Sequence, residues 1–182
     1  ILYGGINIIN SDIEIKDSKI QNSNSEDAIN IISSKTVINN LELTNIAADA
    51  IDIDFGKLTF LKIFCENIKN DCLDISGGIV EGDKLYSKAV YDKGLSFGEN
   101  SKGLITNSKF FNNKVAVAVK DGSKLKLTQS DFKDNNFDIT VFKKKEAYGN
   151  AELTLEELNK TKKLNVILEE NNFFNSLTEH EI

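Results

Sequence analysis

Two aspartates at the same place in successive similar segments are the residues of this sequence best suited to chemistry. Asp52 is the centre of Ile51-Asp52-Ile53, Asp74 is the centre of Leu73-Asp74-Ile75, and Asp54 lies two positions after Asp52. If these segments stack as neighbouring strands, the first two carboxylates lie about 5 Å apart. Like charges at that distance repel by about 1 kcal/mol in water, and by several times more when they are partly desolvated. A raised pKa, a nearby lysine or a bound cation must offset this repulsion.

Paired carboxylates are the groups that glycoside cleavage requires, because one protonates the leaving oxygen while the other activates water or attacks. In lyase or epimerase chemistry, a lysine would act as the base or stabilise charge. The candidate catalytic residues are Asp52, Asp54, Asp74, Lys93, Glu99 and Lys120, and the candidate substrate-binding residues are Asn30, Ser76, Ser96, Asp92 and Asp121. Asp52 and Asp74 are also the candidate ligands of a cation such as Ca²⁺. The alternative is a charged ladder that is only solvated.

A second acidic column precedes the same segments by two residues. It consists of Asp27, Asp49 and Asp71, and Lys93 continues it in the next repeat. Because these side chains fall at a turn, we expect them to accept hydrogen bonds from turn amides. Lys93 is expected to neutralise Asp71.

A repeat of about 22 residues positions all of these side chains. It is visible in INIISSKTVINNLELTNIAADA from Ile29, IDIDFGKLTFLKIFCENIKNDC from Ile51 and LDISGGIVEGDKLYSKAVYDKG from Leu73. Each copy begins with alternating apolar and polar residues, and two further apolar clusters follow between turn-forming residues. We therefore predict an all-β, single-stranded right-handed parallel β-helix of roughly seven coils, with three short strands per coil.

The repeat frame breaks after Phe142, so we place the β-helix at residues 1–145 and a C-terminal cap at residues 146–182. Thr154-Leu155-Glu156-Glu157 has the pattern of a capping box and predicts a short helix over the open end of the rod. Residues 164–168 predict a final strand that docks on the last coils. Since the chain opens at Ile1 with neither an initiator Met nor a leader, we also expect an upstream domain in the full-length chain.

An asparagine ladder marks one turn of the repeat. Asn22, Asn45, Asn67 and Asn112, followed by Asp134, recur at one repeat position. A buried Asn in a turn can bond to the backbone of its own coil and to the amide of the next. We expect this ladder to line the turn internally and to be structural.

The composition disfavours several functional classes. The 182-residue chain has a net charge of −6, and every basic residue is Lys, so nucleic acid is a poor candidate partner. No stretch approaches the run of about 20 apolar residues that a membrane-spanning helix needs. Cys65 and Cys72 fall at small or apolar repeat positions and are expected to be buried free thiols. The lone histidine, His180, leaves a zinc site without enough ligands.

Several segments carry a resemblance to known proteins: SEDAINII, ADAIDIDFG, NDCLDISGG, DKGLSFGENS, VAVKDGS and FKKKEAYGNAEL. They resemble the β-helix region of bacterial proteins associated with spore-coat-H-type kinase-like or lamin-tail domains. Asp92, Lys93, Gly94, Glu99, Lys120 and Asp121 match the motifs of this group.

More broadly, the chain resembles the pectin-lyase-like superfamily of polysaccharide lyases, uronan epimerases and polygalacturonases. That resemblance implies that a polysaccharide binds along the outer face of the first strand of each coil. The sequence has no match to the Asn-Thr-Asp and Gly-His-Gly motifs of polygalacturonases, the Asp-Pro-His-Asp motif of alginate epimerases or the arginine base of pectate lyases.

Two functional hypotheses follow. The first is a β-helix module of a larger cell-surface or secreted protein that binds a polysaccharide; if it also modifies it, the reaction is that of a carbohydrate-active lyase, epimerase or glycoside hydrolase. The second is a non-catalytic structural or interaction spacer, or an adhesin-like solenoid. The extracellular location is implied by the resemblance alone.

Overall fold

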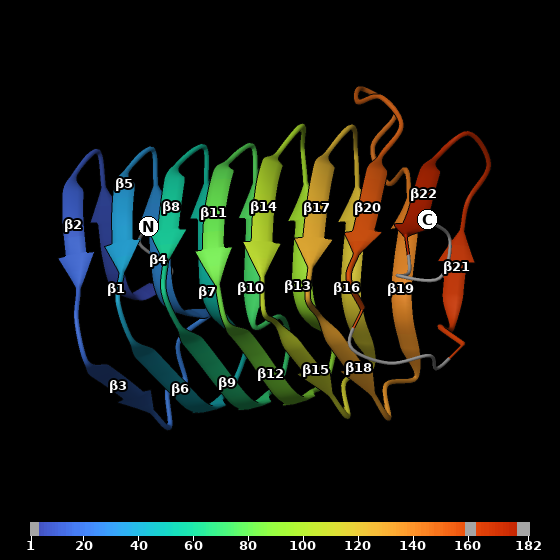
Figure 1. Ribbon diagram of the computed structural model, residues 1–182. Coiled ribbons are helices and arrows are strands. Elements are labelled where there is room, and N and C mark those ends of the chain that lie inside the picture. The colour runs from blue at the N-terminus through green and yellow to red at the C-terminus, as the bar shows by residue number, and fades with distance from the viewer. Residues whose placement is uncertain (1–3, 159–162, 178–182) are drawn as a thin grey trace.

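The computed structural model describes residues 4–158 and 163–177, and all of its regular elements are β-strands. The strands form three parallel sheets, called A, B and C here, that run along a rod (Figure 1). Each coil contributes one strand to each sheet over most of the rod, so neighbours within a sheet are one repeat apart in sequence. The prediction of an all-β parallel β-helix with three strands per coil is confirmed.

Sheet A contains the first strand of each coil: β1 (Gly4–Ile9), β4 (Asp27–Ile32), β7 (Asp49–Asp54), β10 (Leu73–Ser76), β13 (Lys93–Gly98), β16 (Val115–Lys120), β19 (Phe137–Phe142) and β21 (Val166–Leu168). Sheet B contains β2 (Asp12–Ile15), β5 (Lys35–Ile38), β8 (Lys57–Phe60), β11 (Ile79–Asp83), β14 (Lys102–Thr106), β17 (Lys124–Thr128), β20 (Glu152–Glu156) and β22 (Phe173–Leu177). Sheet C contains β3 (Ser18–Gln21), β6 (Leu41–Ile46), β9 (Ile63–Ile68), β12 (Leu85–Val90), β15 (Lys109–Phe111) and β18 (Asp131–Lys133).

The register of sheet A stacks equivalent repeat positions on one another. Ile51 pairs with Leu73 and Ile53 pairs with Ile75, and all four side chains are buried. Because successive side chains of a strand point to opposite faces, the residues between them point outward. Each buried Ile or Leu contributes about 1.5–3 kcal/mol relative to an exposed one, so a one-residue slip is strongly disfavoured. This register is what places Asp52 beside Asp74.

The C-terminal part continues the sheets as strands. Strand β20 covers Glu152–Glu156, so the prediction that a helix begins at residues 154–157 is wrong. Leu153 and Leu155 are buried at alternating positions, and this burial in sheet B outweighs the local capping pattern. The predicted final strand is confirmed as β21, which pairs with β19. Sheet A has eight strands, one more than the seven coils expected.

The asparagine ladder lies on the outside of the rod, so the prediction that it lines the turn internally is wrong. Asn22, Asn45 and Asn112 are exposed, and their φ angles are 57°, 56° and 54°. Asn adopts this left-handed conformation more readily than other residues that carry a side chain. The side chains also bond to one another, since Asn45 Nδ2 donates to Asn22 Oδ1 at 3.1 Å and Asn67 Nδ2 donates to Asn45 Oδ1 at 2.7 Å.

The two cysteines form a disulfide, so the expectation of free thiols is wrong. Cys65 lies on β9 and Cys72 immediately precedes β10, with a Cα–Cα distance of 5.9 Å. Their burial was predicted correctly, and both are fully buried. The chain turns a corner of the coil between them, which brings two positions seven residues apart within disulfide reach.

Candidate functional site

The outer face of sheet A carries the two mid-strand aspartates as direct neighbours. Asp52 on β7 is in register with Asp74 on β10, with Asn30 on β4 beside Asp52 and Ser96 on β13 beside Asp74. Adjacent strands are about 4.8 Å apart, which sets the spacing of these side chains. We call Asp52 and Asp74 the mid-strand pair. The predicted juxtaposition of Asn30, the pair and Ser96 is therefore present.

The Asp52 carboxyl is held in its protonated form by its surroundings. Burial, followed by the nearby carboxylates of Asp54 and Asp74, raises the pKa of Asp52 to about 8. Burial, followed by Glu99 and Asp74, also raises the pKa of Asp54. A protonated Asp52 is a hydrogen-bond donor at neutral pH. The buried Oδ1 of Asn30, which is in register with Asp52, has no hydrogen-bond donor in the described residues.

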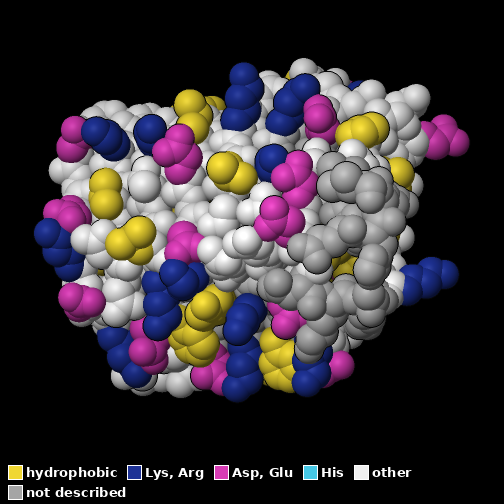
Figure 2. Space-filling model, in the orientation of Figure 1, with side chains coloured by type: hydrophobic (Ala, Val, Ile, Leu, Met, Phe, Trp, Pro, Cys, Tyr) yellow, Lys and Arg dark blue, Asp and Glu magenta, His cyan; other side chains and the backbone are white. Residues whose placement is uncertain are grey.

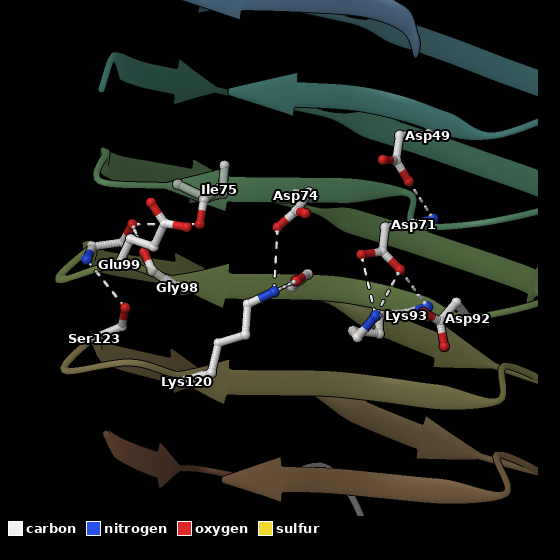
Figure 3. A network of polar contacts seen from close by, with 12 residues as sticks. Asp49, Asp71, Asp74, Ile75, Asp92, Lys93, Gly98, Glu99, Lys120 and Ser123 are labelled. Atoms are coloured by element: carbon white, nitrogen blue, oxygen red, sulfur yellow. Dashed lines mark hydrogen bonds and ion pairs between the residues drawn. The ribbon is translucent and has the colours of Figure 1, made fainter. Parts of the chain in front are cut away.

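Lys120 supplies the positive charge on this face. Its side chain crosses Gly98, where an added Cβ would lie 2.7 Å from Lys120 Cε. The ammonium donates to Ser96 Oγ at 2.9 Å and lies 4.0 Å from Asp74 Oδ1 (Figure 3). Since only 8% of Lys120 is exposed, the glycine and the buried Ser96 fix the position of the ammonium. Asp74 therefore faces a lysine.

The turn column, consisting of Asp27, Asp49 and Asp71, mainly stabilises the stacking of coils. Asp49 Oδ1 accepts from the Asp71 amide at 2.7 Å, and Asp71 Oδ1 accepts from the Lys93 amide at 2.9 Å (Figure 3). The Lys93 ammonium lies 3.3 Å from Asp71 Oδ1. The predicted amide capping by Asp49 and Asp71 and the predicted Lys93–Asp71 pair are confirmed.

Asp92 belongs to the same ion-pair group. Its carboxylate contacts the ammonium of Lys93 and accepts from Lys114 Nζ at 3.0 Å. Burial alone would raise the pKa of Asp92, but the hydrogen bonds from these two lysines lower it. Asp92 and Lys93 thus pair where β13 begins, four and three residues before the mid-strand position of Ser96.

Glu99 and Asp121 lie at the opposite corner of sheet A and hold the segment after β19. Asp121 is fully buried, and its Oδ1 accepts from the backbone amides of Lys144 and Lys145 at 2.7 Å each. The Lys145 ammonium binds Glu99, and the Tyr148 hydroxyl donates to Glu99 Oε2 at 3.5 Å. Asp121 therefore positions the lysine that neutralises Glu99. Ser76 lies between these groups and the mid-strand pair, in register with Asp54 and Gly98.

The side chains on this face do not fit a calcium site. Ca²⁺ takes six to eight oxygen ligands, several of them usually carboxylates. Over residues 4–158 and 163–177, no group of three or more His, Cys, Asp or Glu side chains is arranged to hold a metal ion. Asp74 already faces an ammonium.

Sequence reasoning missed Phe55, an exposed aromatic residue next to Asp54. Its side chain is 64% exposed, and its φ is 55°. The same left-handed φ recurs at the equivalent residues Ser33 (48°) and Glu99 (60°), so it is a property of this corner of the repeat. The ring lies over Gly77 in the next coil, where an added Cβ would come within 2.6 Å of Phe55 Cδ1. The available signal was a phenylalanine at a repeat position that Ser33, Gly77 and Glu99 otherwise fill.

The family model of the right-handed β-helix region matches residues 4–177. The chain belongs to this β-helix family. No curated protein matches this β-helix. Among solved structures, a similar chain is QnrB1, a plasmid-mediated fluoroquinolone resistance protein, with 10% identity, a TM-score of 0.23, and coverage of 92% of this chain and 91% of that chain. A likeness that weak carries no argument about function. None of these comparisons supports the narrower resemblance to proteins with spore-coat-H-type or lamin-tail domains.

On the side drawn in Figure 2, lysine and acidic side chains are interspersed, with single hydrophobic side chains between them. Exposed pairs such as Lys19–Glu42 and Lys88–Glu66 connect neighbouring coils of sheet C. Such pairs contribute little to stability and neutralise one another. In the part of the chain that is described, no helix is long and apolar enough to cross a membrane.

Proposed function

We propose that this β-helix binds an extended polysaccharide along the outer face of sheet A, over β4, β7, β10 and β13. The observation that carries the proposal is the mid-strand pair, because burial and like charge keep a proton on Asp52. Asp52 receives no hydrogen bond from any other residue described. Asp74 Oδ1 is buried and receives none either, while 23% of the Asp74 side chain as a whole is exposed. A sugar hydroxyl both donates and accepts, so it can satisfy a protonated carboxyl and an ionised one together.

The preferred ligand is a neutral glycan. Asp54 and Asp74 raise the pKa of Asp52, as does the rest of the acidic surface formed by Asp27 and Asp49. A uronic acid polymer would add further negative charge to this surface and would be repelled. Phe55 provides an exposed aromatic surface at one edge of the face, where the C–H face of a sugar ring can pack.

Glycoside cleavage is a second candidate function. A protonated Asp52 can donate to a leaving glycosidic oxygen, and Asp74, set beside Lys120, can act as the partner carboxylate. Strand spacing of about 4.8 Å is close to the carboxylate separation of retaining enzymes. This role predicts that cleavage is lost as the pH rises through about 8, where the Asp52 proton is released.

The test is a screen of neutral and acidic oligosaccharides against the native chain, Asp52→Ala/Asp74→Ala and Phe55→Ala. We expect saturable binding of a neutral oligosaccharide, with affinity at least about tenfold weaker in the double variant and several-fold weaker in Phe55→Ala. The matched control is Asp12→Ala, which removes an exposed aspartate from β2 of sheet B. Unchanged binding in the double variant would contradict the proposal, and no binding by any chain would favour the spacer function.

A cell-surface or secreted location is part of the same proposal. The Cys65–Cys72 disulfide supports it, because disulfides persist mainly in oxidising compartments. Trapping thiols with an alkylating reagent in the native cell would show whether both cysteines are oxidised there.

A further inference from the structure

A cavity of about 340 Å³ opens at the corner where sheet C leads into sheet A. It is lined by Ala89, Val90, Tyr91, Asn112, Asn113, Lys114 and Asn136, which come from three successive coils. We call it the corner cavity. It does not include any residue of the mid-strand pair, so what it binds is independent of the function proposed above.

The corner cavity coincides with a missing rung of the asparagine ladder. Ala89 occupies the ladder position between Asn67 and Asn112, and its φ of 52° is the left-handed conformation of the asparagines. Alanine pays a conformational cost there that asparagine largely avoids. Its methyl group also leaves a gap between Asn67 and Asn112 that the side-chain amide of an asparagine would span.

The walls of the gap present unused hydrogen-bonding groups. Asn45 and Asn67 each donate to the asparagine one coil before. Asn112 has no such acceptor at position 89, and within the described ranges its side-chain amide and that of Asn136 make no hydrogen bond. Asn113 differs, because its side chain accepts from the Val90 amide at 3.1 Å and donates to Ser87 Oγ at 3.0 Å, so it forms a fixed floor.

Tyr91 and Lys114 define the chemistry of the other wall. The Tyr91 side chain is 55% exposed, and the Lys69 ammonium, one coil earlier, lies 3.8 Å from its ring centroid. The cavity extends in the other direction, toward Lys114 and Asn136 at the equivalent positions of the next two coils. Lys114 is paired with Asp92, so its charge is largely neutralised.

We propose that the corner cavity binds one or two pyranose units of a neutral glycan. The C–H face of the sugar packs on the Tyr91 ring, and its hydroxyl or acetamido groups bond to the side-chain amides of Asn112 and Asn136. The volume is in the range of small-ligand sites. An exposed aromatic ring beside free amides favours such a ligand over an anion.

The test uses the whole chain and two probes, the trisaccharide of N-acetylglucosamine and cellotriose, titrated to about 10 mM with backbone NMR as the readout. We expect saturable shifts of residues 89–91 and 112–114 with at least one probe. Tyr91→Ala should weaken that binding by about tenfold or more.

Ala89→Asn is the decisive variant, because it restores the missing rung. Its side chain would accept from Asn112 and donate to Asn67, so the unfolding midpoint should rise while binding falls by about tenfold or more. Asn45→Ala is the matched control, because it removes a rung of the ladder in coils where Ala47 and Lys69 occupy the position of Tyr91. It should lower the unfolding midpoint and leave binding unchanged. Absence of saturable shifts with both probes, or binding by Ala89→Asn equal to that of the native chain, would overturn the proposal.

Discussion

On sheet A, the turn column of Asp27, Asp49 and Asp71 stands beside the mid-strand pair, with the same side chain at nearly the same spacing along the rod. In the turn column, two of the three carboxylates accept an amide from the next coil, and the column ends on Lys93. In the mid-strand pair, the amides of the strand are already bonded within the sheet, so the carboxylates have no backbone donor. Position relative to the strand therefore decides which aspartates bond to the backbone of the next coil and which do not.

The turn column and the mid-strand pair also differ in the pKa values of their buried carboxyls. Burial raises the pKa of Asp49 to about 6 and that of Asp71 to about 7, while an amide hydrogen bond or Lys93 works against it. Asp52 has only raising influences, and its pKa is the highest of the three. Mutations in the turn column should consequently lower the stability of the fold, whereas mutations in the mid-strand pair should weaken ligand binding.

The largest effect is expected from Asp71→Ala, which should reduce the free energy of unfolding by about 3 kcal/mol. The change leaves the partly buried Lys93 ammonium and its amide without the acceptor that Asp71 provides. Urea denaturation at pH 7 measures the loss. Glu66→Ala is the control, because it breaks an exposed pair with Lys88 and should cost less than about 1 kcal/mol. Equal losses in the two variants would mean that Asp71 contributes no more than an exposed ion pair, and would contradict a stabilising role for the turn column.

The second largest effect is a gain in the free energy of unfolding, which we expect from Asp52→Asn at high pH. The pKa of an Asp in an unfolded chain is about 3.9, whereas the pKa of Asp52 in the folded chain is about 8. Its contribution to stability is therefore complete below pH 4 and is lost as the pH rises toward 8. Asp52→Asn cannot ionise, so it should match the native chain near pH 4 and exceed it by about 2 kcal/mol at pH 9, after allowance for partial exposure.

Denaturation curves at pH 4, 6, 8 and 9 check this prediction, with Asp12→Asn as an exposed control. Parallel pH profiles of Asp52→Asn and the native chain would contradict the raised pKa. A gain at every pH would instead point to a packing effect of the amide.

Much of this fold could be predicted because one repeat fixes three strands and their register at once. Ile51-Asp52-Ile53 and Leu73-Asp74-Ile75 have to stack if their apolar residues share a core, and that alone brings the two aspartates together. The ends of the chain were harder. At residues 154–157 the capping pattern is local, whereas the burial of Leu153 and Leu155 depends on β17, whose paired residues lie 28 positions earlier.

The corners were harder still, because their geometry depends on backbone dihedrals that the residue types only bias. The asparagine ladder was recognised, but its exposure follows from the left-handed turn. The Cys65–Cys72 bridge depends on how tightly one corner closes. Phe55 was missed because side-chain orientation in a strained turn cannot be read from alternation.

The smallest effect concerns the electrostatic coupling within the mid-strand pair itself. Burial is the largest cause of the raised pKa of Asp52, followed by Asp54 and then Asp74. Asp54→Asn should therefore lower that pKa more than Asp74→Asn does, and in both variants it should stay above the ordinary value of Asp. Titration of the Asp52 side-chain carboxyl by ¹³C NMR measures both shifts. A pKa restored to the ordinary range by Asp74→Asn would mean that mutual repulsion, and not burial, sets the protonation of Asp52, and the pair would then resemble a coupled carboxylate dyad.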